Sequence, residues 1–212
     1  MNEATQILPS LRETLAAATR SQIVEAATQL FLEHGYVGTS IGTIARRAGV
    51  AVQTIYNAVG NKAAVLSAVL DAAASGSNAP TPVPVFMAER TRETTDVAAL
   101  VSMLADWFVE VNERTASIHL IIQQAAAVDE DAAELNRARS RQRLLNYGRA
   151  AAALRERGGL AQGLTDEQAA ATIWALGHPT AYRTFVLDEG WSVDDYRNWL
   201  GIALASALGE HG

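Results

Sequence analysis

The stretch from Thr39 to Lys62 limits what this chain can fold into more than any other part of it. Its first half places apolar side chains at the i, i+3, i+4 and i+7 spacing of one helix face, at Ile41, Ile44, Ala45 and Ala48. Gly49 follows, at the place where a left-handed residue ends a helix. A second run, 52–57, keeps Ile55 for an inner face and leaves polar side chains outside. Two short amphipathic helices around a glycine turn predict a helix-turn-helix, whose second helix fits the DNA major groove.

The order of residues around this helix pair is specific. The positions concerned are Gly35-Tyr36, Thr39-Ser40, Ile44 to Val50, Thr54-Ile55-Tyr56 and Gly60-Asn61-Lys62. Together they resemble the DNA-binding domain of the tetracycline-repressor (TetR) family over roughly residues 19 to 70. The resemblance implies an all-α chain with an N-terminal three-helix DNA-binding domain and a C-terminal helical domain for ligand binding and dimerisation. The helix-turn-helix itself is expected at about 40–59.

The resemblance also implies which side chains contact DNA. Phosphate contacts fall on Thr43, Thr54, Tyr56 and Lys62, and contacts to base edges fall on Val52, Gln53 and Asn57. The chemistry agrees, because Gln pairs with adenine N6 and N7, Val covers a thymine methyl, and Lys brings a point charge to phosphate. Arg46 and Arg47 end the first helix of the pair, where compensation of the helix dipole and DNA contact are both open.

The charge distribution is compatible with DNA binding although the formal net charge of the chain is −6. Residues 1–76 hold five basic and five acidic side chains, so the acidic excess lies entirely in the remainder. Attraction to phosphate depends on local patches rather than on the net charge of a protein. The acidic part is therefore expected to face away from DNA.

Local sequence signals predict four segments. The first helix is expected to begin at Thr19, because Thr19 and Gln22 have the spacing of a capping box. The residues before it form either a frayed terminus or an arm for the minor groove. The expected division is a flexible arm at 1–18, a DNA-binding domain at 19–74, a Pro-containing linker at 75–95 and an effector-binding and dimerisation domain at 96–212.

The composition argues against several other classes of protein. No apolar stretch approaches the length of a membrane span, and no secretory signal is visible, so no membrane partner is expected. The absence of Cys excludes disulfides and Cys-ligated metal and is typical of a cytoplasmic protein. The acidic run 129–131 suits a helix start better than a metal site, so neither a metal nor a cofactor is expected. Four scattered His residues and no glycine-rich phosphate loop argue against an enzyme.

The C-terminal part is expected to contain a ligand cavity between its helices. A central helix over 96–114 and another over 116–128 place His119 and Gln123 one turn apart, as cavity lining or as a structural or dimer contact. The arginines at 137, 139, 141 and 143 are interpreted as solvated charges rather than as a second nucleic-acid surface. The candidate pocket residues are Phe86, Met103, Trp107, His119, Gln123, Tyr147, Trp174, His178 and Tyr182.

The last helices carry apolar side chains at helical spacing, which suits either packing within one chain or association of two chains. In the TetR family the last two long helices form a four-helix bundle across a two-fold axis. Two operator half-sites about 34 Å apart also require a dimer. The expected homodimer interface consists of Tyr182, Phe185, Val193, Tyr196, Leu200 and Leu204.

The sequence therefore predicts a ligand-responsive transcriptional regulator that resembles the TetR family. We expect a repressor that binds double-stranded operator DNA and is released by a small, largely apolar effector. The alternative is a helix-turn-helix protein without an effector, whose second domain would have a filled core.

Overall fold

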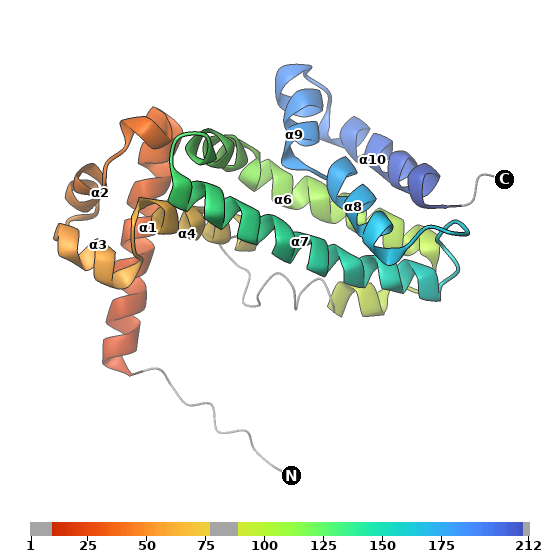
Figure 1. Ribbon diagram of the computed structural model, residues 1–212, viewed down its shortest axis with the longest axis horizontal. Helices are drawn as coiled ribbons and strands as arrows, with labels where there is room; N and C mark the ends of the chain where they lie inside the picture. Colours follow the sequence, from red (N-terminus) through yellow and green to blue (C-terminus); the bar gives the residue numbers. More distant parts are fainter. Residues whose placement is uncertain (1–9, 77–88, 210–212) are drawn as a thin grey trace, which may run out of the picture. The chain divides into compact units, whose positions relative to one another are not determined.

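The computed structural model describes residues 10–76 and 89–209, which are mostly helical and contain no strand (Figure 1). The predicted all-α fold, with a helix-turn-helix domain followed by a helical domain, is confirmed. The chain divides into two compact units, Met1–Val69 and Leu70–Gly212. The division falls inside α4 (Lys62–Ser75), earlier than the expected linker, much of which lies outside the described residues.

The first unit consists of α1 (Leu11–Gly38), α2 (Ile41–Ala48), α3 (Val52–Ala58) and the first turns of α4. The first three helices pack against one another and bury Ile23, Leu30, Phe31, Ile44 and Ile55. Apolar side chains at helical spacing on each helix thus meet in one small core.

The expected start of the first helix at Thr19 is wrong. α1 begins at Leu11, because Ser10 and Glu13 form a capping box in which each side chain accepts a hydrogen bond from the other's backbone amide. Thr19 lies inside this helix, and its hydroxyl donates to the carbonyl of Leu15 over 2.9 Å. Two sequences with capping-box spacing are present, at 10–13 and 19–22, and the earlier one sets the boundary.

The second unit is built on two long helices, α6 (Val97–Ala126) and α7 (Glu130–Glu156). The helices α8 (Asp166–Leu176), α9 (Pro179–Tyr182) and α10 (Val193–Leu208) complete it, with a π-helical turn at Arg183–Asp188. The two helices expected over 96–114 and 116–128 form the single helix α6, which buries Asn112, Thr115 and Ala116 at the expected break. None of the helices in the described ranges is long and apolar enough to span a membrane.

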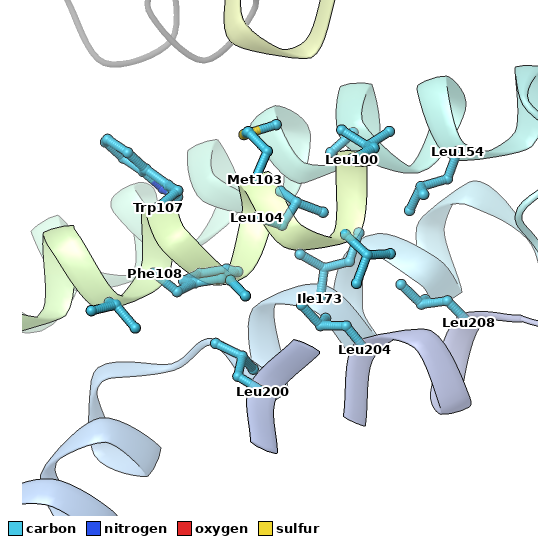
Figure 2. Packing of buried hydrophobic residues seen from close by; sticks show 14 of the residues in the cluster. Leu100, Met103, Leu104, Trp107, Phe108, Leu154, Ile173, Leu200, Leu204 and Leu208 are labelled. Carbon is cyan, nitrogen blue, oxygen red and sulfur yellow. The ribbon is translucent and has the colours of Figure 1, made fainter. Parts of the chain in front are cut away.

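The core of the second unit gathers where α6, α8 and α10 meet (Figure 2). Leu104, Ile173 and Leu204 are fully buried there, one from each helix. The amide of Asn112 links α6 to the end of α8 by donating to the carbonyl of Gly177 over 2.9 Å. This bond satisfies two polar groups that the core would otherwise isolate from water.

The C-terminal end of α4 is held by one arginine of α6. The Nε and Nη2 atoms of Arg114 donate to the carbonyl oxygens of Ala73 and Ala74 over 2.9 and 3.1 Å. The last carbonyls of a helix have no partner within it, and a cation there also suits the helix dipole. The last turn of α4 is thereby fixed to α6.

Candidate DNA interface and ligand cavity

The turn between α2 and α3 has the local geometry that the sequence predicts. Ser40 and Thr43 form a capping box at the start of α2, and Gly49 ends that helix with φ of 67°, in the left-handed region. The predicted role of Gly49 is confirmed. α3 begins three residues later at Val52, so the two short helices are separated by a tight turn.

The outer face of α3 presents the base-reading candidates to solvent. Val52, Gln53, Tyr56 and Asn57 are exposed, whereas Ile55 is fully buried beneath them. The Gln53 Nε2 atom donates to Asn57 Oδ1 over 3.0 Å, which orients both amides one turn apart. Exposed amides held on a helix face are suited to the edges of bases in a groove.

Two phosphate candidates are held by neighbours within the first unit. The first is Thr43, whose hydroxyl accepts a hydrogen bond from the Ser40 amide over 3.0 Å. Thr54, a further candidate, is half-buried at the start of α3. The second is Lys62, the first residue of α4, whose ammonium group lies 4.0 Å above the centre of the buried Tyr36 ring. This cation–π contact holds the lysine in one place.

Of the two arginines left open at the end of α2, Arg46 is exposed and Arg47 contacts α1. Arg47 donates to Gln29 Oε1 over 2.9 Å and pairs with Glu33 of α1 at 3.4 Å. Arg20 of α1, which the sequence did not indicate, donates to the carbonyl of Ala58 at the end of α3 over 2.7 Å. Arg20 and Arg47 therefore both fasten the helix pair to α1.

The second unit contains a cavity of about 570 Å³. Its walls come from the end of α4, from α6 and α7, and from Trp174 and Pro179. Three aromatic contacts connect these walls: Phe108 with Tyr147 (5.3 Å between ring centres), Tyr147 with Trp174 (5.8 Å), and Trp174 with His178 (4.6 Å). A volume of this size with largely apolar walls can hold a drug-sized molecule.

The structure brings four of the nine candidate pocket residues into the cavity lining: Trp107, His119, Tyr147 and Trp174. Met103 and Tyr182 are buried in the core instead, and His178 lies behind Trp174. Gln123 is exposed although it lies one turn from the buried His119 on the same helix, close to the end of α6 at Ala126. Phe86 lies outside the described residues.

Arg143 lines the cavity, and the interpretation of it as a solvated surface charge is wrong. One of its guanidinium nitrogens lies 3.3 Å from Nε2 of His119, and its Cζ atom lies 5.0 Å from the centre of the Trp174 ring. Burial is the main factor that lowers the pKa of Arg143, to about 10, so the group stays charged at neutral pH. Alternate arginines point in different directions around a helix, and this one points inward.

His119 is buried and uncharged in the folded protein. Burial lowers its pKa to about 3, with further lowering by the charges of Arg143, His178 and Arg139. A neutral imidazole has one ring nitrogen that can accept, and Arg143 is the cationic donor beside it.

The predicted dimer interface needs correction. Tyr182, Tyr196, Leu200 and Leu204 are buried in the chain's own core, so they have almost no surface left for a partner. Phe185 and Val193 are half-buried, and Phe185 packs between Trp191 and Trp199. On the outer side of α10 the large exposed apolar side chain is Ile202.

Within the described residues, no group of three or more His, Asp or Glu side chains is arranged to hold a metal ion.

Comparisons of the sequence and of the structure with known proteins point to the same family. Residues 23–69 match the family model described as bacterial regulatory proteins, tetR family. No curated protein matches the sequence.

Solved structures resemble almost the whole chain. The SmeT–triclosan complex is 26% identical, covers 92% of this chain and 93% of its own, and has a TM-score of 0.68. NalD, the secondary repressor of the MexAB-OprM multidrug efflux pump in Pseudomonas aeruginosa, is 24% identical in one structure, covering 94% of this chain and 100% of its own with a TM-score of 0.70. The structure of native NalD is 23% identical, covers 93% of this chain and 100% of its own, and has a TM-score of 0.70.

Proposed function

The chain is a TetR-family transcriptional regulator, and from this premise we propose that it binds an inverted-repeat operator as a homodimer and leaves it when a small molecule fills the cavity. The proposal is supported by the presence of both parts of such a switch in one chain. One unit carries a helix with exposed base-reading side chains, and the other encloses a cavity of about 570 Å³. The mode of regulation is repression.

DNA recognition depends on α3 and the start of α4 in this proposal. Val52, Gln53 and Asn57 read base edges, while Thr43, Thr54, Tyr56 and Lys62 contact phosphates. Exposure of Gln53, Tyr56 and Asn57 on α3 supports these roles. Operator DNA places the site of action in the cytoplasm.

Dimerisation uses the outer side of α10, around Ile202, rather than the buried side chains of that helix. The exposure of Ile202, which is 69% in the single chain, and of Ala205 one turn further along α10 supports an interface on this side of the helix. A two-fold dimer presents two recognition helices to two half-sites about 34 Å apart.

The effector is small and largely apolar, and it binds among Trp107, Tyr147 and Trp174. The solved complex of SmeT with triclosan and the role of NalD as repressor of a multidrug efflux pump support this class of molecule. A helix-turn-helix protein without an effector would have a filled second core, and the cavity argues against that alternative. We propose no catalytic activity.

Selection of bound sequences from a random duplex DNA library, with purified protein at fixed salt, tests the proposal. Recovery of an inverted repeat is expected, with half-sites about one helical turn apart. Recovery of no motif by a folded dimeric protein would contradict operator binding. The selected duplex then serves to measure whether ligands release it.

A further inference from the structure

The described lining of the cavity contains more positively than negatively charged side chains. It includes four arginines and one carboxylate: Arg92, Arg139, Arg143, Arg149 and Asp71. This excess of positive charge occurs in a chain whose formal net charge is −6. The cavity is thus opposite in sign to the protein around it.

The single carboxylate of the described lining is already paired. Asp71 Oδ2 lies 2.6 Å from Nη2 of Arg139. Arg143 forms no ion pair with any carboxylate in the described ranges; the groups against it are the His119 ring and the face of Trp174. Neither group carries a negative charge, because His119 is neutral and the indole offers only its ring quadrupole.

A guanidinium partly withdrawn from water with no carboxylate in ion-pair contact is costly to the protein, and the charge of Asp71, which acts on Arg143 from a greater distance, offsets only part of the effect of burial. An anion that enters the cavity would compensate that cost, and a planar carboxylate matches the fork of guanidinium donors in a bidentate geometry. A cation would meet repulsion from four arginines. A neutral molecule would leave Arg143 as it is.

The walls beyond Arg143 are apolar and aromatic. Trp174 stacks on Tyr147, and Tyr147 packs on Phe108, so an aromatic surface continues from the guanidinium into the cavity. Leu104, Val111 and Ala150 add aliphatic surface to the same lining. A ligand that suits both parts has a negative head and an apolar body.

We propose that the cavity binds an amphipathic organic anion whose carboxylate pairs with Arg143 and whose apolar body lies on Trp174, Tyr147 and Phe108. The proposal rests on the proposed function, in which the same cavity takes the effector, and it narrows the expected class from largely apolar molecules to largely apolar molecules that carry a carboxylate. Arg143 sets this specificity, and His119 holds the guanidinium in place through its Nε2 atom.

Isothermal titration calorimetry with three molecules of one shape tests the proposal, using the full chain without DNA at pH 7.5 and fixed ionic strength. The probes are 1-naphthylacetate, the neutral 1-naphthylacetamide and the cationic 2-(1-naphthyl)ethylamine. The carboxylate is expected to bind about tenfold or more tighter than the amide, because its bond to Arg143 is charge-assisted. The amine is expected to bind weakest.

Variants assign the preference to one side chain. Arg143→Met keeps most of the apolar stem and should bind carboxylate and amide alike, whereas Arg143→Lys should keep part of the preference. Arg141→Met is the matched control, because Arg141 lies on the same helix, is mostly exposed and is absent from the cavity lining. Circular dichroism melting shows whether each variant is folded.

Three results would overturn the anion site: equal binding of the three probes, tightest binding of the amine, or an unchanged preference in a folded Arg143→Met protein. Absence of binding by all three probes would overturn it as well. Failure of the proposed function would give a different result from failure of the anion site. If a carboxylate binds through Arg143 but does not release the selected operator, the anion site stands and its role in regulation is wrong.

Discussion

Gly177 lies so close to the ring of Phe108 that a Cβ atom added to the glycine would stand 2.3 Å from two ring carbons. The same glycine accepts the hydrogen bond of Asn112 through its carbonyl oxygen. It therefore joins the end of α8 to α6 by close packing and by a polar contact. Phe108 also lines the cavity, so this junction determines part of the cavity wall.

Gly177→Ala is expected to lower the free energy of unfolding by about 1–3 kcal/mol, because the new methyl group overfills a packed site. Urea denaturation followed by circular dichroism measures the change. Gly148→Ala is the control, since nothing lies within 4 Å of its added Cβ and the residue is inside α7. That substitution should raise the free energy of unfolding by about 0.5–1 kcal/mol. Equal effects of the two substitutions would contradict the packing argument.

His119 should make the folded protein sensitive to acid. Its pKa is about 3 when folded and near 6.5 when unfolded, so the unfolded chain binds the proton first as pH falls. The stabilisation is complete above pH 6.5 and is lost as pH falls toward 3, at about 1.4 kcal/mol per pH unit. His119→Gln should therefore flatten the dependence of unfolding free energy on pH between 7 and 5, as denaturant titrations at several pH values would reveal. Parallel pH profiles of both proteins would exclude this role.

Lys62→Ala is expected to weaken binding to all DNA sequences and to reduce the slope of log affinity against log salt. Each lost phosphate contact accounts for about 0.9 units, so a dimer should lose about two. Gln53→Ala should instead change the preferred bases at fixed slope. Fluorescence anisotropy on the selected operator at four salt concentrations measures both, and Lys62→Arg, which keeps the charge, should retain the slope. An unchanged slope in Lys62→Ala would make the phosphate assignment wrong.

Lys62 is the only lysine in the sequence. Acylation of amines by a mild reagent, read by mass spectrometry of peptides, therefore reports on this side chain without mutation. Operator DNA should protect Lys62 from the reagent, whereas a duplex of scrambled sequence at the same concentration should protect it less.

In the proposed dimer Ile202→Asp places a charge in an apolar interface, so this variant should be a monomer and should lose high-affinity operator binding. Sedimentation velocity measures the change. Leu145→Asp is the matched control, since Leu145 is 67% exposed against 69% for Ile202 but lies on α7. Truncation before Val193 would be uninformative, because it would remove Leu200, Leu204 and Leu208 from the chain's own core. A dimeric Ile202→Asp protein would move the interface elsewhere.

Local features were predictable from the sequence because their causes are local. Gly49 ends α2, Asn61 caps α4 through a hydrogen bond to the Ala64 amide, and Thr165 caps α8, as the residue types alone indicate. The start of α1 was missed because the chain contains two sequences with capping-box spacing, and the earlier one, Ser10 with Glu13, caps the helix although the turns that it adds are exposed.

The cavity was only partly predictable, because its lining depends on how separate helices are rotated against one another. Trp107 and Met103 lie one turn apart on α6, yet Trp107 lines the cavity and Met103 belongs to the core. An arginine in a run of arginines is ordinarily solvated, and nothing in the sequence distinguishes Arg143 from Arg141. An apolar stripe such as that of α10 likewise predicts burial without saying whether the same chain or a second copy covers it.

Because Arg114 fixes the last turn of α4, a rotation of this helix about that turn displaces its first residues the most. Lys62 is the first residue of α4, and the carbonyl groups that accept hydrogen bonds from Arg114 lie at the other end of the same helix. At 1.5 Å per residue the distance between these two ends of α4 is about 18 Å, so a rotation of about 10° about the end bound by Arg114 displaces the Lys62 end by about 3 Å. That displacement equals the length of a hydrogen bond. A rotation of this size is thus large enough to break the phosphate contact that we propose for Lys62.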